Sequence, residues 1–193
     1  MRSLAAVVVV ACLGASAYAE SERPRLERVP VQHIQPTVGA VVNSKTIYLN
    51  RCVGGCKVYA GYTDSRTNKS AIGQGTLSAY SYGDSSWNSV VNCMKSVMSR
   101  FNVTVTATDP GPAVDHFEVM VGGTPGQLGL SAGIGGIAEY SCSSPGVCSK
   151  YLPNALVFVF SQVWQGNVNE ICAAAAQEIA HTWSLDHVVD ASE

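Results

Sequence analysis

The sequence predicts an α/β protein in which two helices pack against a mixed, twisted sheet. Three observations predict this class: a long amphipathic helix, a continuously apolar strand, and an alanine-rich helix that follows the strand. Of the 193 residues, 47% are hydrophobic and 13% are charged, which suits one domain with a core of its own. We therefore expect a single globular domain over residues 45–193.

Residues 1–19 have the pattern of a signal peptide. Arg2 supplies the positive start, Leu4–Leu13 the apolar segment, and Ala17–Ala19 the cleavage pattern of small residues. The alternative is a bacterial lipobox ending at Cys12, which would give a lipid-anchored or periplasmic protein. The apolar run before Cys12 is short for a lipobox, so secretion is the favoured prediction. No other stretch reaches the roughly 18 to 20 apolar residues that a membrane-spanning helix needs.

Six of the seven cysteines lie in the expected mature chain, an even number that is typical of an oxidising compartment. They are Cys52, Cys56, Cys93, Cys142, Cys148 and Cys172. The first two, and likewise the fourth and fifth, could each close a short loop, which would leave Cys93 and Cys172 to join two helices. Fifteen connectivities are possible, and the sequence does not choose among them. A cysteine metal site is the alternative, but the spacings lack paired CxxC motifs.

The charges exclude one class of partner. With 12 basic and 14 acidic residues, the chain has no basic stripe that could follow a phosphate backbone, so nucleic acid is not an expected partner. Residues 20–44 are polar and interrupted by Pro24, Pro30 and Pro36. This segment is predicted to be a leader or linker.

The first half of the domain contains one strand and the clearest helix. Thr46–Asn50 (TIYLN) predicts a short strand, and the Gly/Ser/Asn-rich stretch that continues to Ser86 predicts loops. Asp84, Ser85 or Ser86 could cap the helix that follows. Seven apolar residues then recur with helical spacing: Trp87, Val90, Val91, Met94, Val97, Met98 and Phe101.

The second half contains three strands and the second helix. Residues 102–106 (NVTVT) and 116–121 (HFEVMV) alternate like half-buried strands, and 155–160 (ALVFVF) is apolar throughout, like a central strand. The last helix is predicted to begin at Asn167, whose side chain can accept from the first-turn amides. It runs through the alanines toward Ser184.

Polar residues near the end of this helix have the spacing of a metal site. Positions four apart lie about 40° apart around a helix axis, so Gln177 and His181 project from one face and Glu178 borders it. Two such side chains can hold a metal while the carboxylate between them polarises a bound water. His187 can reach the same metal only if the helix ends near Ser184 and the chain turns back.

Residues 177–187 (QEIAHTWSLDH) resemble the extended zinc motif HExxHxxGxxH of metzincin metalloproteases of the matrixin type. Glu178, His181 and His187 match, whereas Gln177 replaces the first histidine and Ser184 the glycine. The resemblance covers roughly residues 46–187 and implies a zincin-like N-terminal subdomain with a backing helix and an active-site helix. It also implies that residues 135–140 form the edge strand along which a peptide substrate lies.

The resemblance implies a secreted zinc endopeptidase that acts on peptides or proteins. Zn²⁺ would be held by Gln177, His181 and His187, with Glu178 as general base. An amide oxygen is a weaker zinc ligand than imidazole, and a left-handed Ser184 would cost about 1 kcal/mol. No methionine follows Met120, so the Met-turn of the family has no counterpart. Either the sequence is truncated after residue 193 or the protein lacks that half of the active site.

Two other functions remain open, and the sequence does not indicate the oligomeric state. One is a pseudoprotease that binds peptides or a partner without cleaving them. The other is a disulfide-linked extracellular domain without a ligand at this site. Gly129–Gly133 also matches the GxSxG pattern of serine hydrolases, but the glycines on both sides predict a loop in place of the required strand and helix.

Overall fold

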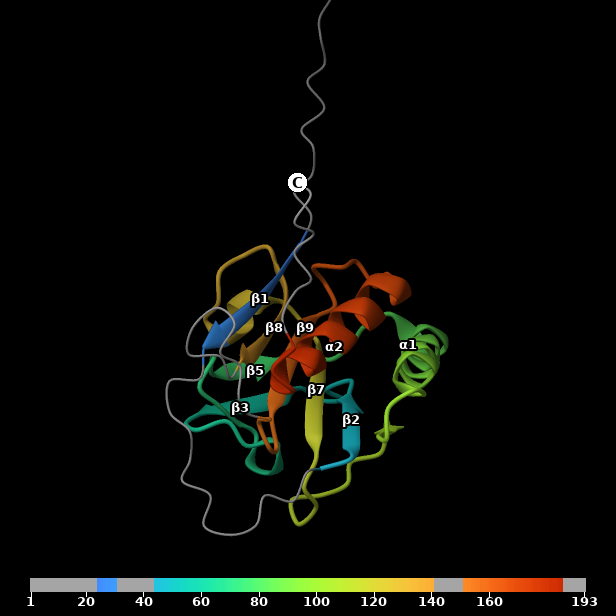
Figure 1. The fold of residues 1–193 in the computed structure, drawn as a ribbon. Coiled ribbons are helices and arrows are strands. Elements are labelled where there is room, and N and C mark those ends of the chain that lie inside the picture. Colours follow the sequence, from blue (N-terminus) through green and yellow to red (C-terminus); the bar gives the residue numbers. More distant parts are fainter. Residues whose placement is uncertain (1–23, 31–43, 141–150, 186–193) are drawn as a thin grey trace, which may run out of the picture.

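The computed structural model describes residues 24–30, 44–140 and 151–185. These residues form three layers: two α-helices, a six-stranded sheet and a three-stranded sheet (Figure 1). One hydrophobic cluster lies between the helices and the large sheet, and a second lies between the two sheets. The predicted α/β class, with a mixed sheet and two packed helices, is therefore confirmed.

The large sheet has the strand order β1-β8-β9-β7-β2-β6. These strands are β1 (Arg25–Pro30), β8 (Ile134–Tyr140), β9 (Leu156–Phe160), β7 (Phe117–Gly122), β2 (Thr46–Asn50) and β6 (Thr104–Thr106). The last four strands of this order are mutually parallel, whereas β8 is antiparallel to β9, and β1 runs parallel to β8. The strand predicted at 116–121 is present as β7, but the prediction that it is half-buried is wrong, because all its residues, polar Glu118 included, lie inside the protein.

Helices α1 (Gly83–Met98) and α2 (Val168–Thr182) cover one face of this sheet, and a disulfide between Cys93 and Cys172 joins them. The predicted side-chain cap of α1 is wrong, because the helix begins at Gly83, before all three candidate residues. Val97 is 44% exposed and Phe101 lies beyond the helix end, so the buried face is shorter than predicted. No helix in the described ranges is long and apolar enough to span a membrane.

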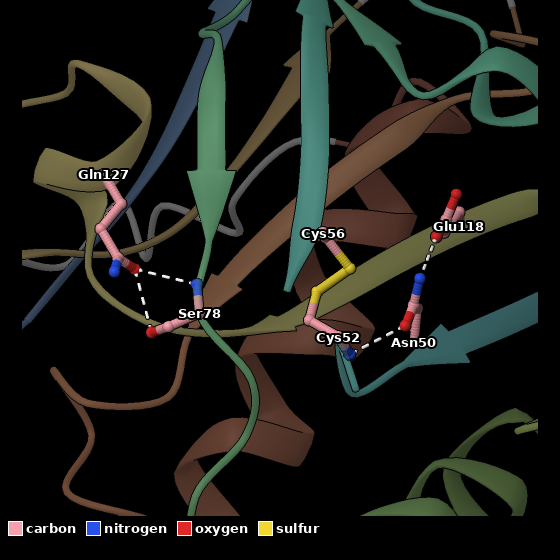
Figure 2. The surroundings of a disulfide bond; sticks show 6 residues. All are labelled: Asn50, Cys52, Cys56, Ser78, Glu118 and Gln127. Atoms are coloured by element: carbon pink, nitrogen blue, oxygen red, sulfur yellow. Dashed lines mark hydrogen bonds between the residues drawn. A yellow bond between two sulfur atoms is a disulfide. The ribbon is translucent and has the colours of Figure 1, made fainter. Parts of the chain in front are cut away.

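The other face of the large sheet is covered by part of the stretch that was predicted to be loops. Its strands are β3 (Cys56–Ala60), β4 (Lys69–Ser70) and β5 (Gly75–Leu77), and two 3-10 helices, η1 (Ser65–Thr67) and η2 (Pro125–Leu128), flank them in the fold. A disulfide between Cys52 and Cys56 closes the turn from β2 to β3 (Figure 2). Both observed disulfides are among the predicted pairings, and Cys142 and Cys148 lie outside the described residues.

A buried carboxyl group lies next to this disulfide. Asn50 Nδ2 donates a hydrogen bond to Glu118 Oε1 at 2.7 Å, and Asn50 Oδ1 accepts one from the Cys52 amide at 2.8 Å (Figure 2). Burial raises the pKa of Glu118 to about 7, because the charged form loses its hydration inside the protein. The folded protein therefore holds this proton more tightly than the unfolded chain does.

We expect Glu118→Gln to remove a pH-dependent part of the stability. The stabilisation by the Glu118 proton is complete below pH 4.5 and is lost as the pH rises through about 7, a total of roughly 3 kcal/mol. Glutamine keeps the Oε1 acceptor for Asn50 and does not ionise. Urea unfolding between pH 4 and 8 should therefore show a smaller loss of stability for the variant. Equal pH dependence in both proteins would contradict the assignment.

Candidate active site

Helix α2 begins and ends in ways that fix the position of its last turn. Asn167 Oδ1 accepts hydrogen bonds from the backbone amides of the first turn. At the other end, Ser184 has φ of 63°, and its amide donates to the His181 carbonyl at 2.9 Å. The Leu185 amide donates to the Ala180 carbonyl at 3.0 Å, which completes a Schellman motif. The predicted helix end near Ser184 is confirmed, and this residue has the left-handed conformation that glycine adopts freely.

Glu178 lies between α2 and β8 and is 0% exposed. A Cβ atom on Gly136 would lie only 2.7 Å from Glu178 Oε1, so the absence of a side chain at Gly136 makes room for the carboxyl group. Neither carboxyl oxygen accepts a hydrogen bond from any residue that the structure describes. Burial, and secondly the negative charge of Glu27, raise the pKa of Glu178 well above its usual range.

His181 lies one turn further along α2 and is 1% exposed. Its Nδ1 atom lies 2.8 Å from the Leu185 carbonyl oxygen, and its ring packs edge-on against that of Tyr140 with centroids 5.8 Å apart. A carbonyl can only accept, so Nδ1 carries a proton, and in the neutral form of the ring Nε2 carries the lone pair. Metal-binding histidines are commonly held in this tautomer by a backbone carbonyl.

The other predicted ligands are only partly placed. Gln177 is half-buried and precedes His181 by four positions on α2, whereas His187 lies outside the described residues. Within the described ranges no three His, Cys, Asp or Glu side chains form a metal-binding group, but the predicted set contains an amide as well as His187. Ser131, of the GxSxG pattern, is exposed in the loop between η2 and β8, as predicted.

The strand that lies beside this site, β1, was not predicted from the sequence. Residues 135–140 were expected to form the edge of the sheet, but β1, from the predicted leader, pairs with β8 on its outer side. Leu26 of β1 approaches the space above Gly136, and the Arg28 guanidinium lies 4.8 Å from the ring centroid of Tyr140. The only local signal was a weak alternation within RLERVP, which is too polar to predict a strand.

Comparisons of the chain with protein-family models, with curated proteins and with solved structures found no match. The chemistry of the site is therefore inferred from its own side chains. Three features define it: the enclosed Glu178 carboxyl group, the oriented His181 ring, and β1 lying along β8.

We expect Ser184→Gly to stabilise the protein. Glycine adopts positive φ without the clash between Cβ and the backbone, so the gain should be about 1 kcal/mol, less the added entropy of the unfolded chain. Ser99→Gly is a matched control, because Ser99 also ends a helix but has φ of −60°. Thermal unfolding should show a higher midpoint for the first variant and a lower one for the second. A lower midpoint for both would contradict the left-handed turn.

Proposed function

We propose that this protein is a secreted zinc-dependent endopeptidase of the metzincin type. The observation that carries the proposal is the Glu178 carboxyl group, which is enclosed, unpartnered within the described residues and next to the turn that carries His181. A buried carboxyl group whose pKa is strongly raised supports a role in proton transfer. The Schellman motif at Ser184 also supports the proposal, because the zinc motif requires the chain to turn at this point after α2.

The chemistry of the three proposed ligands, Gln177, His181 and His187, suits a zinc ion. With its proton on Nδ1, a neutral His181 would offer Nε2 as a metal ligand, and Gln177 would offer an amide oxygen from the same side of α2. His187 would be the third ligand. Two imidazoles and an amide carry no negative charge, so the ion would keep its full positive charge. This neutral set would bind zinc more weakly than three imidazoles do.

Glu178 would perform the proton transfers. Zinc at this site would supply a Lewis acid that polarises the scissile carbonyl and lowers the pKa of a water molecule. The Glu178 carboxylate would take a proton from the attacking water and then give it to the leaving amine. A nearby cation would favour the ionised carboxylate and so oppose the effect of burial on its pKa.

Secretion is part of the proposal. The predicted signal peptide supports it, and the two disulfides of the described residues are compatible with an oxidising, extracellular environment. The peptide-binding pseudoprotease is the second candidate, favoured by Gln177 in place of a histidine. Both functions would bind a peptide along β8, but only the protease would cleave it.

The first test is the zinc content of the purified protein after dialysis. We expect about one zinc per chain in the wild type and less than about a tenth in His181→Ala, whereas Gln177→His should hold zinc more tightly. His33→Ala, which alters a histidine outside the motif, is the matched control. Zinc that is unaffected by His181→Ala would place the metal elsewhere and overturn the proposal.

The second measurement separates the protease from the pseudoprotease. Glu178→Gln should retain zinc but lose cleavage of an unfolded protein substrate by roughly 100-fold or more, because it cannot accept the proton. Zinc binding without cleavage, both in the wild type and in a Leu26→Ser/Arg28→Ser variant that weakens β1, would favour the pseudoprotease. Cleavage that survives Glu178→Gln would exclude Glu178 as the base.

A further inference from the structure

Strand β1 occupies the position next to β8 that an extended peptide would take. The two strands run parallel, with Leu26 opposite Gly136 and Arg28 opposite Ala138, and the Arg25 amide donates to the Gly133 carbonyl at 2.8 Å. Among the described strands, β1 pairs only with β8, and its other edge has no partner. A strand bound in this way makes the contacts of β-augmentation, in which a peptide adds to the edge of a sheet.

Two side chains of β1 face α2 and contact residues of the candidate active site. Leu26 packs against the cluster under the helices, and its Cδ2 would lie 3.1 Å from a Cβ atom on Gly136. The same imagined Cβ would contact Glu178, so Leu26 and this carboxyl group border the same space above Gly136. Arg28 lies over the Tyr140 ring, which packs against the His181 ring with an angle of 83° between the two planes.

The other described side chains of β1 include an exposed ion pair and one apolar residue packed against the second cluster. Arg25 and Glu27 form an ion pair of 3.5 Å with side chains 61% and 39% exposed, and such a pair stabilises little in water. Val29 is half-buried against the cluster between the sheets. On the face of β1 that points toward the candidate active site, the contacts with the rest of the protein therefore come from an apolar residue, Leu26, and a cation two positions later, Arg28.

We propose that β8, with Gly136 and Tyr140, is a binding site for an extended peptide of the pattern Leu-x-Arg, and that β1 is its occupant within the same chain. The relevance of this site to catalysis by Glu178 rests on the proposed function, but peptide binding itself requires neither zinc nor hydrolysis. A tethered strand has an effective concentration in the millimolar range, so a free peptide at micromolar concentration does not displace it. Weakening β1 exposes the site.

The test measures binding of a fluorescein-labelled peptide of residues 24–30 (PRLERVP) by anisotropy, in the presence of EDTA. We expect Leu26→Ser/Arg28→Ser in the full chain to bind it at least roughly tenfold more tightly than the wild type does. Arg25→Ser is the matched control, because it removes a cation of β1 that does not contact Tyr140, and it should bind like the wild type. A peptide with serine at its Leu and second Arg positions should not bind to the double variant.

Several results would overturn the proposal. One is equal peptide affinity of the wild type and the double variant, and another is equal binding of the two peptides. A wild-type dimer that becomes a monomer in the double variant would show that β1 is exchanged between two copies. If the double variant does not fold, Arg28→Ser alone changes an exposed side chain and should show a smaller gain in the same direction. Because EDTA removes the metal, failure of zinc binding would not affect this result.

Discussion

The close approach of α2 to the sheet is the constraint on which the site depends. Ala174 and Ala175 are fully or almost fully buried in the cluster between α2, α1 and the sheet, and Gly136 on β8 removes the side chain below Glu178. Small residues let a helix lie close to its neighbours, so a long side chain on that face has little room to reach water. The alanine-rich composition of α2 therefore explains how a carboxyl group comes to be enclosed between helix and strand. The disulfide from Cys172 to α1 and the turn at Ser184 hold this arrangement at both ends of the helix.

Three buried carboxyl groups lie in the described part of the protein, and burial raises the pKa of each of them. Glu118 has a hydrogen bond from Asn50, and the side chain of Thr63 supplies one to Glu139. These hydrogen bonds offset part of the cost of desolvating the two carboxyl groups, so the burial of Glu118 and Glu139 has a structural explanation. Glu178 has no such partner within the described residues and lies close to the negative charge of Glu27. An enclosed polar group without a partner lowers the stability of a fold, so its presence next to His181 favours a chemical role over a structural one.

The sequence predicted the elements whose signals are local. The apolar run of β9, the cap at Asn167 and the end of α2 near Ser184 each depend on neighbouring residues, and the structure has them as predicted. β1 was not predicted, because a polar segment becomes a strand only through pairing with β8, more than a hundred positions away. The small sheet was missed for the same reason, since its short strands depend on packing under β7 and β9. At the site, Gln177, Glu178 and His181 lie close together on α2 as expected. The position of β1 over the edge of β8 was not predicted, because it depends on pairing between segments far apart in the sequence.

The two proposals are linked through the protonation of Glu178. A general base must be ionised, whereas the enclosed Glu178 is held toward the protonated form by burial and by Glu27. The second cause comes from β1, since Glu27 is the residue between Leu26 and Arg28, and Leu26 borders the same space above Gly136 as the carboxyl group. A peptide that replaced β1 would bring its own residue at this middle position. With a neutral residue there, the like charge would be absent and the pKa of Glu178 would be raised less, whereas burial, the larger cause, would remain. The residue at the middle position of the docked strand therefore sets part of the shift in the pKa of Glu178.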